Sequence, residues 1–154
     1  MSTKYVIVLN ANTNICLGVT TASPGTPVVL SILQGAGSPL TQWYLDANSG
    51  AISLAGSPEG NPLYLDFQGT SASNGNGVIV SNSVLGRTFQ KWNWVGNPPY
   101  VMNVGAPTYC IDDTGSTQPG TKVYIYNQMN GNINQQWQFL AVPVLEEALV
   151  ASSR

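Results

Sequence analysis

The chain has 154 residues, enough for one domain of ordinary size, and only 8% of them are charged, with a net charge of −2 and no histidine. The lack of histidine excludes Ser-His-Asp and Cys-His nucleophiles and His-ligated zinc. Five scattered basic residues are too few for a nucleic-acid-binding or anionic-lipid-binding surface. Gly, Pro, Asn, Ser and Thr take up the share of the sequence that charged residues usually occupy. This composition predicts an all-β domain with an uncharged, hydrogen-bonding surface.

Short apolar or alternating segments separated by turn residues predict strands along the whole chain. The first, residues 5–9, leads into an Asn-rich turn and does not resemble a signal peptide. No apolar run reaches the length of a membrane span, so no membrane insertion is expected. The later strands are expected at residues 16–19, 28–31, 43–45, 52–54, 64–67, 78–81, 92–94, 101–103, 110–113, 123–126 and 137–139.

Three of the four tryptophans share one repeated pattern. Trp43, Trp92 and Trp137 are 49 and 45 residues apart, and the last two follow Gln-x, whereas Thr41 replaces that Gln in the first copy. Upstream of each tryptophan lies a second shared block, at residues 16–19, 64–67 and 110–113. Between this block and the tryptophan, each copy has a glycine followed by an alternating strand. Four short strands cannot bury their own apolar face, so three copies should close around one core. We predict repeats at about residues 1–50, 51–99 and 100–142, with the three indoles buried around a pseudo-threefold axis.

The repeat resembles the ricin B-chain-like (R-type) β-trefoil lectin family over about residues 4–142. The resemblance implies a single β-trefoil domain of three four-stranded repeats, residues 1–142, with a C-terminal tail at 143–154. It also implies a non-enzymatic lectin without cofactors or metals, which recognises terminal galactose or N-acetylgalactosamine on glycans. In that family each shallow pocket lies within one repeat and combines a carboxylate, an aromatic ring and an Asn-Gln pair.

The third repeat holds the full set that this resemblance requires. Asp112 is the expected carboxylate, Tyr126 the aromatic ring fourteen residues later, and Asn134 and Gln135 the amide pair before the tryptophan. Carboxylates make short, charge-assisted hydrogen bonds to hydroxyl groups, and an electron-rich ring suits the C–H face of a pyranose. These four residues are therefore the main candidates for a carbohydrate site.

Two further residues are expected to flank this site. Tyr124 shares a strand face with Tyr126 because side chains alternate with a period of two, and Gly115 closes the turn where ligand would approach the backbone. A structural interpretation stays open at this point, in which the Asp112-Asp113 pair is an ordinary polar turn and both tyrosines face solvent.

The other two repeats keep less of the set. In the second repeat Asp66, Asn82 and Gln90 are candidates for a weak site, but Ser81 stands where the ring is expected and Phe89 where the Asn is expected. The first repeat has lost nearly every position, with Gly18 for the Asp, Ser31 for the ring and Leu40 for the Asn. We interpret the first repeat as structural only.

Other functions are weighed against the lectin. A glycosidase needs two carboxyl groups facing each other across a cleft, and the adjacent Asp112 and Asp113 should point to opposite faces of a strand. A Ca²⁺ site at that pair lacks the spacing of a known loop. A protease inhibitor acting through the Pro/Gly-rich loops at residues 56–62 or 96–99, and the glycan-targeting subunit of a toxin, remain alternatives.

Cys16 and Cys110 occupy equivalent positions in two repeats and are expected to be free, buried thiols, because such positions lie too far apart for a disulfide. Free thiols favour the cytoplasm without excluding secretion. Residues 145–150 are the one good helix-forming segment, of one or two turns. This segment either packs on the domain as a frayed end or exposes Leu145, Leu149 and Val150 to a second copy of the chain.

Overall fold

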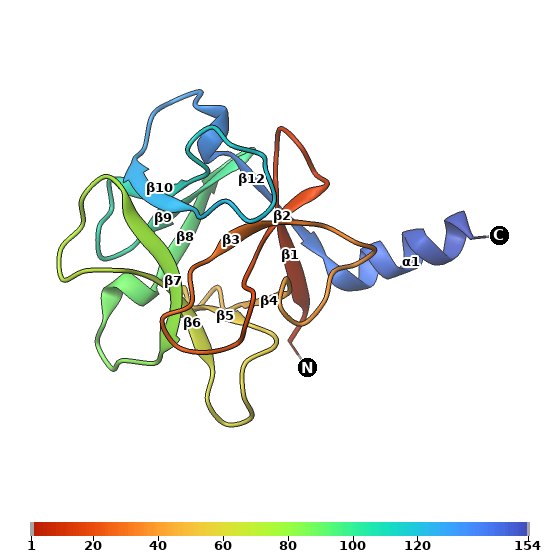
Figure 1. Cartoon of the computed structure of the whole chain (residues 1–154), viewed down its shortest axis with the longest axis horizontal. Helices are drawn as coiled ribbons and strands as arrows, with labels where there is room; N and C mark the ends of the chain where they lie inside the picture. The colour runs from red at the N-terminus through yellow and green to blue at the C-terminus, as the bar shows by residue number, and fades with distance from the viewer. Residues whose placement is uncertain (1, 154) are drawn as a thin grey trace.

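A computed structural model describes residues 2–153; residues 1 and 154, which end the predicted domain and tail, lie outside the described residues. Figure 1 shows short strands curled into a closed body, with one helix projecting from it. The elements, in chain order, are β1 (Lys4–Leu9), β2 (Ile15–Gly18), β3 (Val29–Ile32), β4 (Trp43–Leu45), β5 (Ile52–Leu54), β6 (Leu63–Phe67), β7 (Asn76–Asn82), the 3-10 turn η1 (Thr88–Gln90), β8 (Trp92–Gly96), β9 (Pro99–Asn103), β10 (Tyr109–Asp112), β11 (Tyr124–Asn127), the 3-10 turn η2 (Ile133–Gln135), β12 (Trp137–Ala141) and α1 (Val142–Ser152).

The first and last strand of each repeat form a ring. β12 pairs with β1, β1 with β4, β4 with β5, and β8 with β9, all antiparallel. The Trp92 N–H donates to the Gly50 carbonyl at 2.8 Å and so joins β8 to the turn before β5. The middle strands form three hairpins, β2–β3, β6–β7 and β10–β11, on this ring. The predicted all-β fold of three four-stranded repeats is confirmed.

A cycle of backbone hydrogen bonds marks the pseudo-threefold axis. The Val28 N–H donates to the Val78 carbonyl at 2.9 Å, Val78 to Val123 at 3.0 Å, and Val123 back to Val28 at 3.1 Å. All three side chains are buried, with at most 1% exposed. The three hairpins therefore meet at equivalent positions and close the end of the barrel around a shared core.

The three repeated tryptophans are core residues, as predicted. Trp43, Trp92 and Trp137 are at most 1% exposed, and their indole N–H groups donate to the carbonyls of Leu17, Leu65 and Ile111 at 2.9–3.1 Å. A buried indole is stabilised only when its N–H finds an acceptor. Each repeat supplies that acceptor from its own second strand, so the same side chain fixes the same hairpin three times.

Cys16 and Cys110 are free and fully buried, which confirms the expectation from the sequence. Burial raises the pKa of the Cys16 thiol to about 11 and that of Cys110 to about 12, and for Cys110 the nearby charge of Asp112 adds to the effect of burial. Neither thiol is a thiolate at neutral pH, so both are packing residues.

The C-terminal helix is longer than the one or two turns expected. α1 has eleven residues and begins at Val142, which is 6% exposed and packs with Val6, Val8 and Cys16. Leu145 is packed against the same cluster. The second half of the helix extends away from the barrel (Figure 1), where Leu149 and Val150 are 45% and 55% exposed. The structure thus combines a packed first turn with exposed apolar side chains in the second half of the helix, and a contact of this helix with a second copy of the chain stays a prediction.

Candidate functional site

The β10–β11 hairpin places the candidate residues of the third repeat. Its register pairs Asp112 with Tyr124 and Cys110 with Tyr126, so these side chains share one face of the hairpin. Asn134 and Gln135 come from η2, which packs against β10. The Asp113 N–H donates to the Asn134 carbonyl at 3.0 Å and holds η2 beside the end of β10.

A hollow of about 330 Å³ lies between these elements, and Asp112, Tyr126, Asn134 and Gln135 all line it. The remaining lining residues, which sequence reasoning missed, are Asn74, Thr114, Asn127, Met129 and Asn132. The wall is polar apart from the faces of Tyr126 and Met129. The structure therefore brings four of the six predicted residues into one open pocket.

Asp112 is buried, with 5% exposed, yet it makes few hydrogen bonds. Its Oδ1 accepts from the Thr114 N–H at 2.6 Å and its Oδ2 from the Gln135 Nε2 at 2.9 Å. A carboxylate offers about four acceptor positions, so two remain for a ligand in the pocket. Thr114 adopts a left-handed backbone with φ of 59°, unusual for a β-branched residue, to bring its N–H under the carboxylate.

Gln135 holds the Asp112 carboxylate in place from the buried side of the pocket. It is fully buried, and its Nε2 donates to Asp112 Oδ2 and to the Asn127 carbonyl at 3.0 Å. Its Oε1 accepts from the Met129 N–H at 2.9 Å. The Asn134 carboxamide, by contrast, is half-buried and makes no hydrogen bond among the described residues. The amide pair thus divides into one residue that fixes the carboxylate and one that is free for ligand.

Tyr124 and Gly115 do not line the pocket. Tyr124 lies beside Asp112 in the ladder, opposite Gly77 of β7 on its other side. Gly115 has φ of 88°, and a β-carbon there would lie 3.7 Å from the Asn134 Nδ2. Gly115 therefore shapes the turn behind Asn134 rather than a surface for ligand.

Asp113 is buried behind the pocket, with 3% exposed, and its Oδ1 accepts from the Gly115 N–H at 2.7 Å. Burial raises the pKa of Asp113 to about 6; the Gly115 hydrogen bond lowers it and the charge of Asp112 raises it further. The two neighbouring carboxyl groups thus differ in environment: Asp112 faces the pocket, and Asp113 supports the turn.

The second repeat contributes Asn74 to the third-repeat pocket. The Asn127 N–H donates to Asn74 Oδ1 at 2.8 Å, and the next residue, Gly75, donates its N–H to the Ile125 carbonyl at 2.9 Å. Because a backbone N–H can only donate, it fixes the amide oxygen of Asn74 and leaves Nδ2 as a free donor. The pocket therefore has an acceptor, Asp112, and a donor, Asn74, from different repeats.

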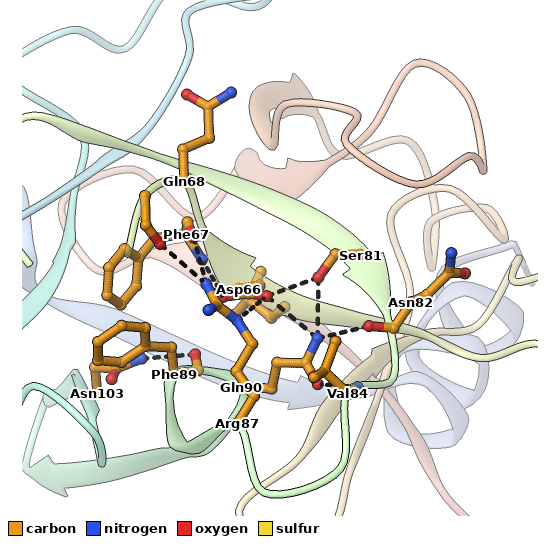
Figure 2. A network of polar contacts seen from close by, with 12 residues as sticks. Asp66, Phe67, Gln68, Ser81, Asn82, Val84, Arg87, Phe89, Gln90 and Asn103 are labelled. Atoms are coloured by element: carbon orange, nitrogen blue, oxygen red, sulfur yellow. Dashed lines mark hydrogen bonds and ion pairs between the residues drawn. The ribbon is translucent and has the colours of Figure 1, made fainter. Parts of the chain in front are cut away.

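In the second repeat the equivalent carboxylate is already saturated (Figure 2). Asp66, 3% exposed, accepts from Arg87 Nε and Nη2 at 2.9 and 3.0 Å, and the ion pair is bidentate. It also accepts from the Phe67 N–H at 2.7 Å, Ser81 Oγ at 2.7 Å and Gln90 Nε2 at 3.2 Å. The Arg87 guanidinium thus occupies the place that a ligand hydroxyl would take.

Asn82 does not join this network through its side chain. Its backbone carbonyl accepts from Gln90 Nε2 at 2.7 Å, and its carboxamide points away from Asp66 (Figure 2). Phe89 packs against Phe67, with ring centroids 4.5 Å apart and the rings tilted by 40°, and it lies under the Arg87 guanidinium. We therefore propose that Asp66, Asn82 and Gln90, the weak second site of the sequence prediction, serve structure and not binding.

Arg87 was missed by sequence reasoning, although a signal for it exists. It lies three residues before Gln90, and the third repeat has Asn132 three residues before Gln135. Asn132 accepts from the Asn134 N–H at 3.0 Å and caps η2 without reaching the carboxylate. Arg87 in place of Asn132 is thus one of the differences that separate the filled pocket from the open one, together with Ser81 in place of Tyr126 and Phe89 in place of Asn134.

The first repeat has no space for a carboxylate. A β-carbon at Gly18 would lie 2.8 Å from Thr41 Cγ2 and 3.0 Å from both the Leu40 carbonyl and Ser31 Oγ. The Val19 N–H donates to that Leu40 carbonyl at 3.0 Å, which repeats the contact between Asp113 and Asn134. The backbone pattern is kept here while the pocket is closed.

A scan against protein-family models gives no match, and no curated protein sequence matches the chain. Solved structures do. The designed threefold-symmetric protein ThreeFoil is 25% identical with a TM-score of 0.75 over 89% of this chain and 97% of ThreeFoil. The fold is a β-trefoil. The C-terminal half of an earthworm R-type lectin, solved in complex with GalNAc, is 15% identical with a TM-score of 0.71 over 90% of this trefoil and 98% of that chain.

Part of a mosquitocidal holotoxin is also similar to the chain, with 19% identity and a TM-score of 0.75 over 91% of the chain. The trefoil spans only 17% of that toxin. Within residues 2–153, no helix is both long and apolar enough to cross a membrane. These similarities establish the fold, and the function is inferred from the residues of the third-repeat pocket.

Proposed function

We propose that the chain is a non-enzymatic carbohydrate-binding protein that recognises terminal galactose or N-acetylgalactosamine in its third-repeat pocket. The observation that carries the proposal is the free acceptor capacity of Asp112. This buried carboxylate keeps two unused acceptor positions in an open pocket, whereas Asp66, its counterpart, accepts five hydrogen bonds from the protein.

The pocket residues suit a neutral pyranose. Asp112 accepts from two vicinal hydroxyl groups, while Tyr126 presents an aromatic face to the C–H side of the ring. Asn134 and the fixed Nδ2 of Asn74 add donors at the rim. A galactose-type ring carries its hydroxyl pair on one edge and leaves a C–H face uncovered, which matches this arrangement, and the earthworm lectin supports the same sugar class.

The pocket does not suit glycoside hydrolysis. Retaining and inverting glycosidases need a second carboxyl group about 5–9.5 Å away across the substrate. Among the described residues that line the pocket, Asp112 is the one carboxylate. Asp113 is buried behind it and hydrogen-bonded to Gly115. A binding role is therefore favoured over a catalytic one.

A glycan array followed by titration calorimetry with galactose tests the proposal. One shallow pocket with one ring and one carboxylate should bind a monosaccharide with a Kd of roughly 0.1–1 mM. Asp112→Ala is expected to abolish binding, and Tyr126→Ser to weaken it at least about tenfold, while Tyr126→Phe retains it because the aromatic face remains.

Glu59→Ala, at an exposed loop outside the pocket, is the matched control for loss of one carboxylate and should bind as the parent does. Circular dichroism of each variant verifies the fold. Absence of binding to every glycan, together with nanomolar inhibition of a protease, would favour the inhibitor alternative. One loop of that alternative, residues 96–99, is a tight hairpin between β8 and β9.

A further inference from the structure

A second, larger hollow lies away from the third-repeat pocket. Its volume is about 780 Å³, and it is formed by the outer face of β4, β5 and β6 with the hairpin between β4 and β5. In Figure 1 these strands lie at the lower part of the molecule, while β10 lies at the upper left. The Gln-Trp repeat pattern gives no signal for this hollow.

Two tyrosines form its walls. The register pairs Tyr44 with Ser53 and Ser53 with Tyr64, so the three side chains form one row across three strands. Neighbouring strands are about 4.8 Å apart, which separates the two tyrosine α-carbons by about 10 Å, with only the small Ser53 between them. Ring contact needs about 3.5–4 Å on each side, so side chains that project from α-carbons at this spacing leave room for one pyranose unit over Ser53.

The hairpin supplies the polar groups. Asp46 Oδ1 accepts from the N–H groups of Asn48 and Ser49 at 3.0 and 3.3 Å, and all three residues line the hollow. The hydrogen bonds from Ser49 and then from the Asn48 N–H hold the pKa of Asp46 below 3.8. An exposed carboxylate, an amide and hydroxyl groups thus line the same hollow as the two rings, and these are the same classes of group that line the third-repeat pocket.

The hollow continues past Tyr64. A second depression of about 210 Å³ shares Ser49, Ala51 and Tyr64 with it and extends to the loop between β7 and η1. Tyr64 therefore lines both depressions. A ligand that uses both depressions is longer than one sugar ring.

We propose that this hollow is a second carbohydrate site, which takes a neutral oligosaccharide of two or more units across Tyr64. One unit lies between Tyr44 and Tyr64 over Ser53, with its hydroxyl groups toward Asp46 and Ser49. The chain then has two independent sites on different parts of its surface, and one copy of it cross-links glycans without self-association.

Backbone ¹⁵N–¹H spectra of the Asp112→Ala chain test this site without the third-repeat pocket. The probes are galactose, N-acetylgalactosamine, lactose, cellotetraose and chitotetraose. At least one tetrasaccharide or disaccharide is expected to shift the amides of Asn48, Ser49 and Ser53 with a Kd of roughly millimolar size. No shift at these amides with any probe overturns the second site.

Three variants in the Asp112→Ala background make the assignment specific. Tyr64→Ser should weaken binding at least about tenfold, and Tyr64→Phe should stay within about twofold. Ser53→Tyr fills the space between the two rings and should abolish binding without removing either ring. Equal binding by all three chains overturns the proposal.

The two sites are distinguishable in the parent chain. If the full set of probes shifts only the amides of Thr114, Tyr126 and Asn134, the result supports the proposed function and refutes the second site. Shifts confined to Asn48, Ser49 and Ser53 support the second site and refute the third-repeat pocket.

Discussion

Replacement of Asp113 by Asn should change how the stability of the protein depends on pH. Burial raises the pKa of this carboxyl from 3.8 to about 6, although its Oδ1 keeps a 2.7 Å hydrogen bond from the Gly115 N–H. Asn retains the oxygen that accepts this bond and carries no charge at any pH. The variant therefore represents the protonated form of Asp113 and isolates the cost of its ionisation.

The sign follows from the two protonation states. Below pH 3.8 Asp113 is protonated in both the folded and the unfolded chain, and ionisation costs nothing. Between pH 3.8 and about 6 the unfolded chain loses its proton first, so the free energy of unfolding falls as the pH rises. Above about pH 6 the full cost is present. The gap between these values, at roughly 1.4 kcal/mol per pH unit, corresponds to about 3 kcal/mol.

Urea unfolding of the parent and Asp113→Asn chains at pH 4, 5, 6 and 7 measures this difference. The stability of the variant relative to the parent should rise by up to about 3 kcal/mol between pH 4 and 7 and stay constant above that. Asp46→Asn is a control, because hydrogen bonds lower the pKa of Asp46 below 3.8: its stabilising effect is lost only as the pH falls below that value, so the difference between this variant and the parent should stay nearly constant from pH 4 to 7. Parallel curves for Asp113→Asn and the parent at every pH would refute the reasoning.

Three further outcomes are expected. Arg87→Ala removes the bidentate partner of the buried Asp66 and should lower the free energy of unfolding in urea by about 2 kcal/mol. This loss is smaller than for a fully buried ion pair because Arg87 is 26% exposed. The variant should not gain sugar binding, since Ser81 offers no aromatic ring. Cys16 and Cys110, with pKa values of about 11 and 12, should resist iodoacetamide at pH 8 in the folded chain and react only in urea; rapid labelling of the folded chain would contradict their burial. A chain that ends at Ala141 lacks the packed Val142 and should lose roughly 2 kcal/mol of stability. If the full chain and this shorter chain have the same oligomeric state in sedimentation, α1 has no role in self-association.

The open pocket and the filled pocket differ by few residues, and this difference explains the limits of sequence reasoning here. Ser81 and Phe89 in place of Tyr126 and Asn134 indicate a weakened second repeat from the sequence. The bidentate contact of Arg87 with Asp66 is not visible there, because the two residues are 21 positions apart and only the packed loop brings them together.

The sequence by itself determined the all-β class, the strands, the three buried tryptophans and the candidate residues Asp112, Tyr126, Asn134 and Gln135. These follow from local periodicity and from a pattern repeated at near-equal spacing, which is information that one chain segment carries. The tertiary structure alone decided which side chains meet across repeats. Asn74 lies at the third-repeat pocket although it is 53 positions before its hydrogen-bond partner Asn127. The row of Tyr44, Ser53 and Tyr64 likewise exists only in the strand register. Contact between hairpins of neighbouring repeats places Asn74 at the pocket, and the registers of β4 with β5 and of β5 with β6 create the tyrosine row.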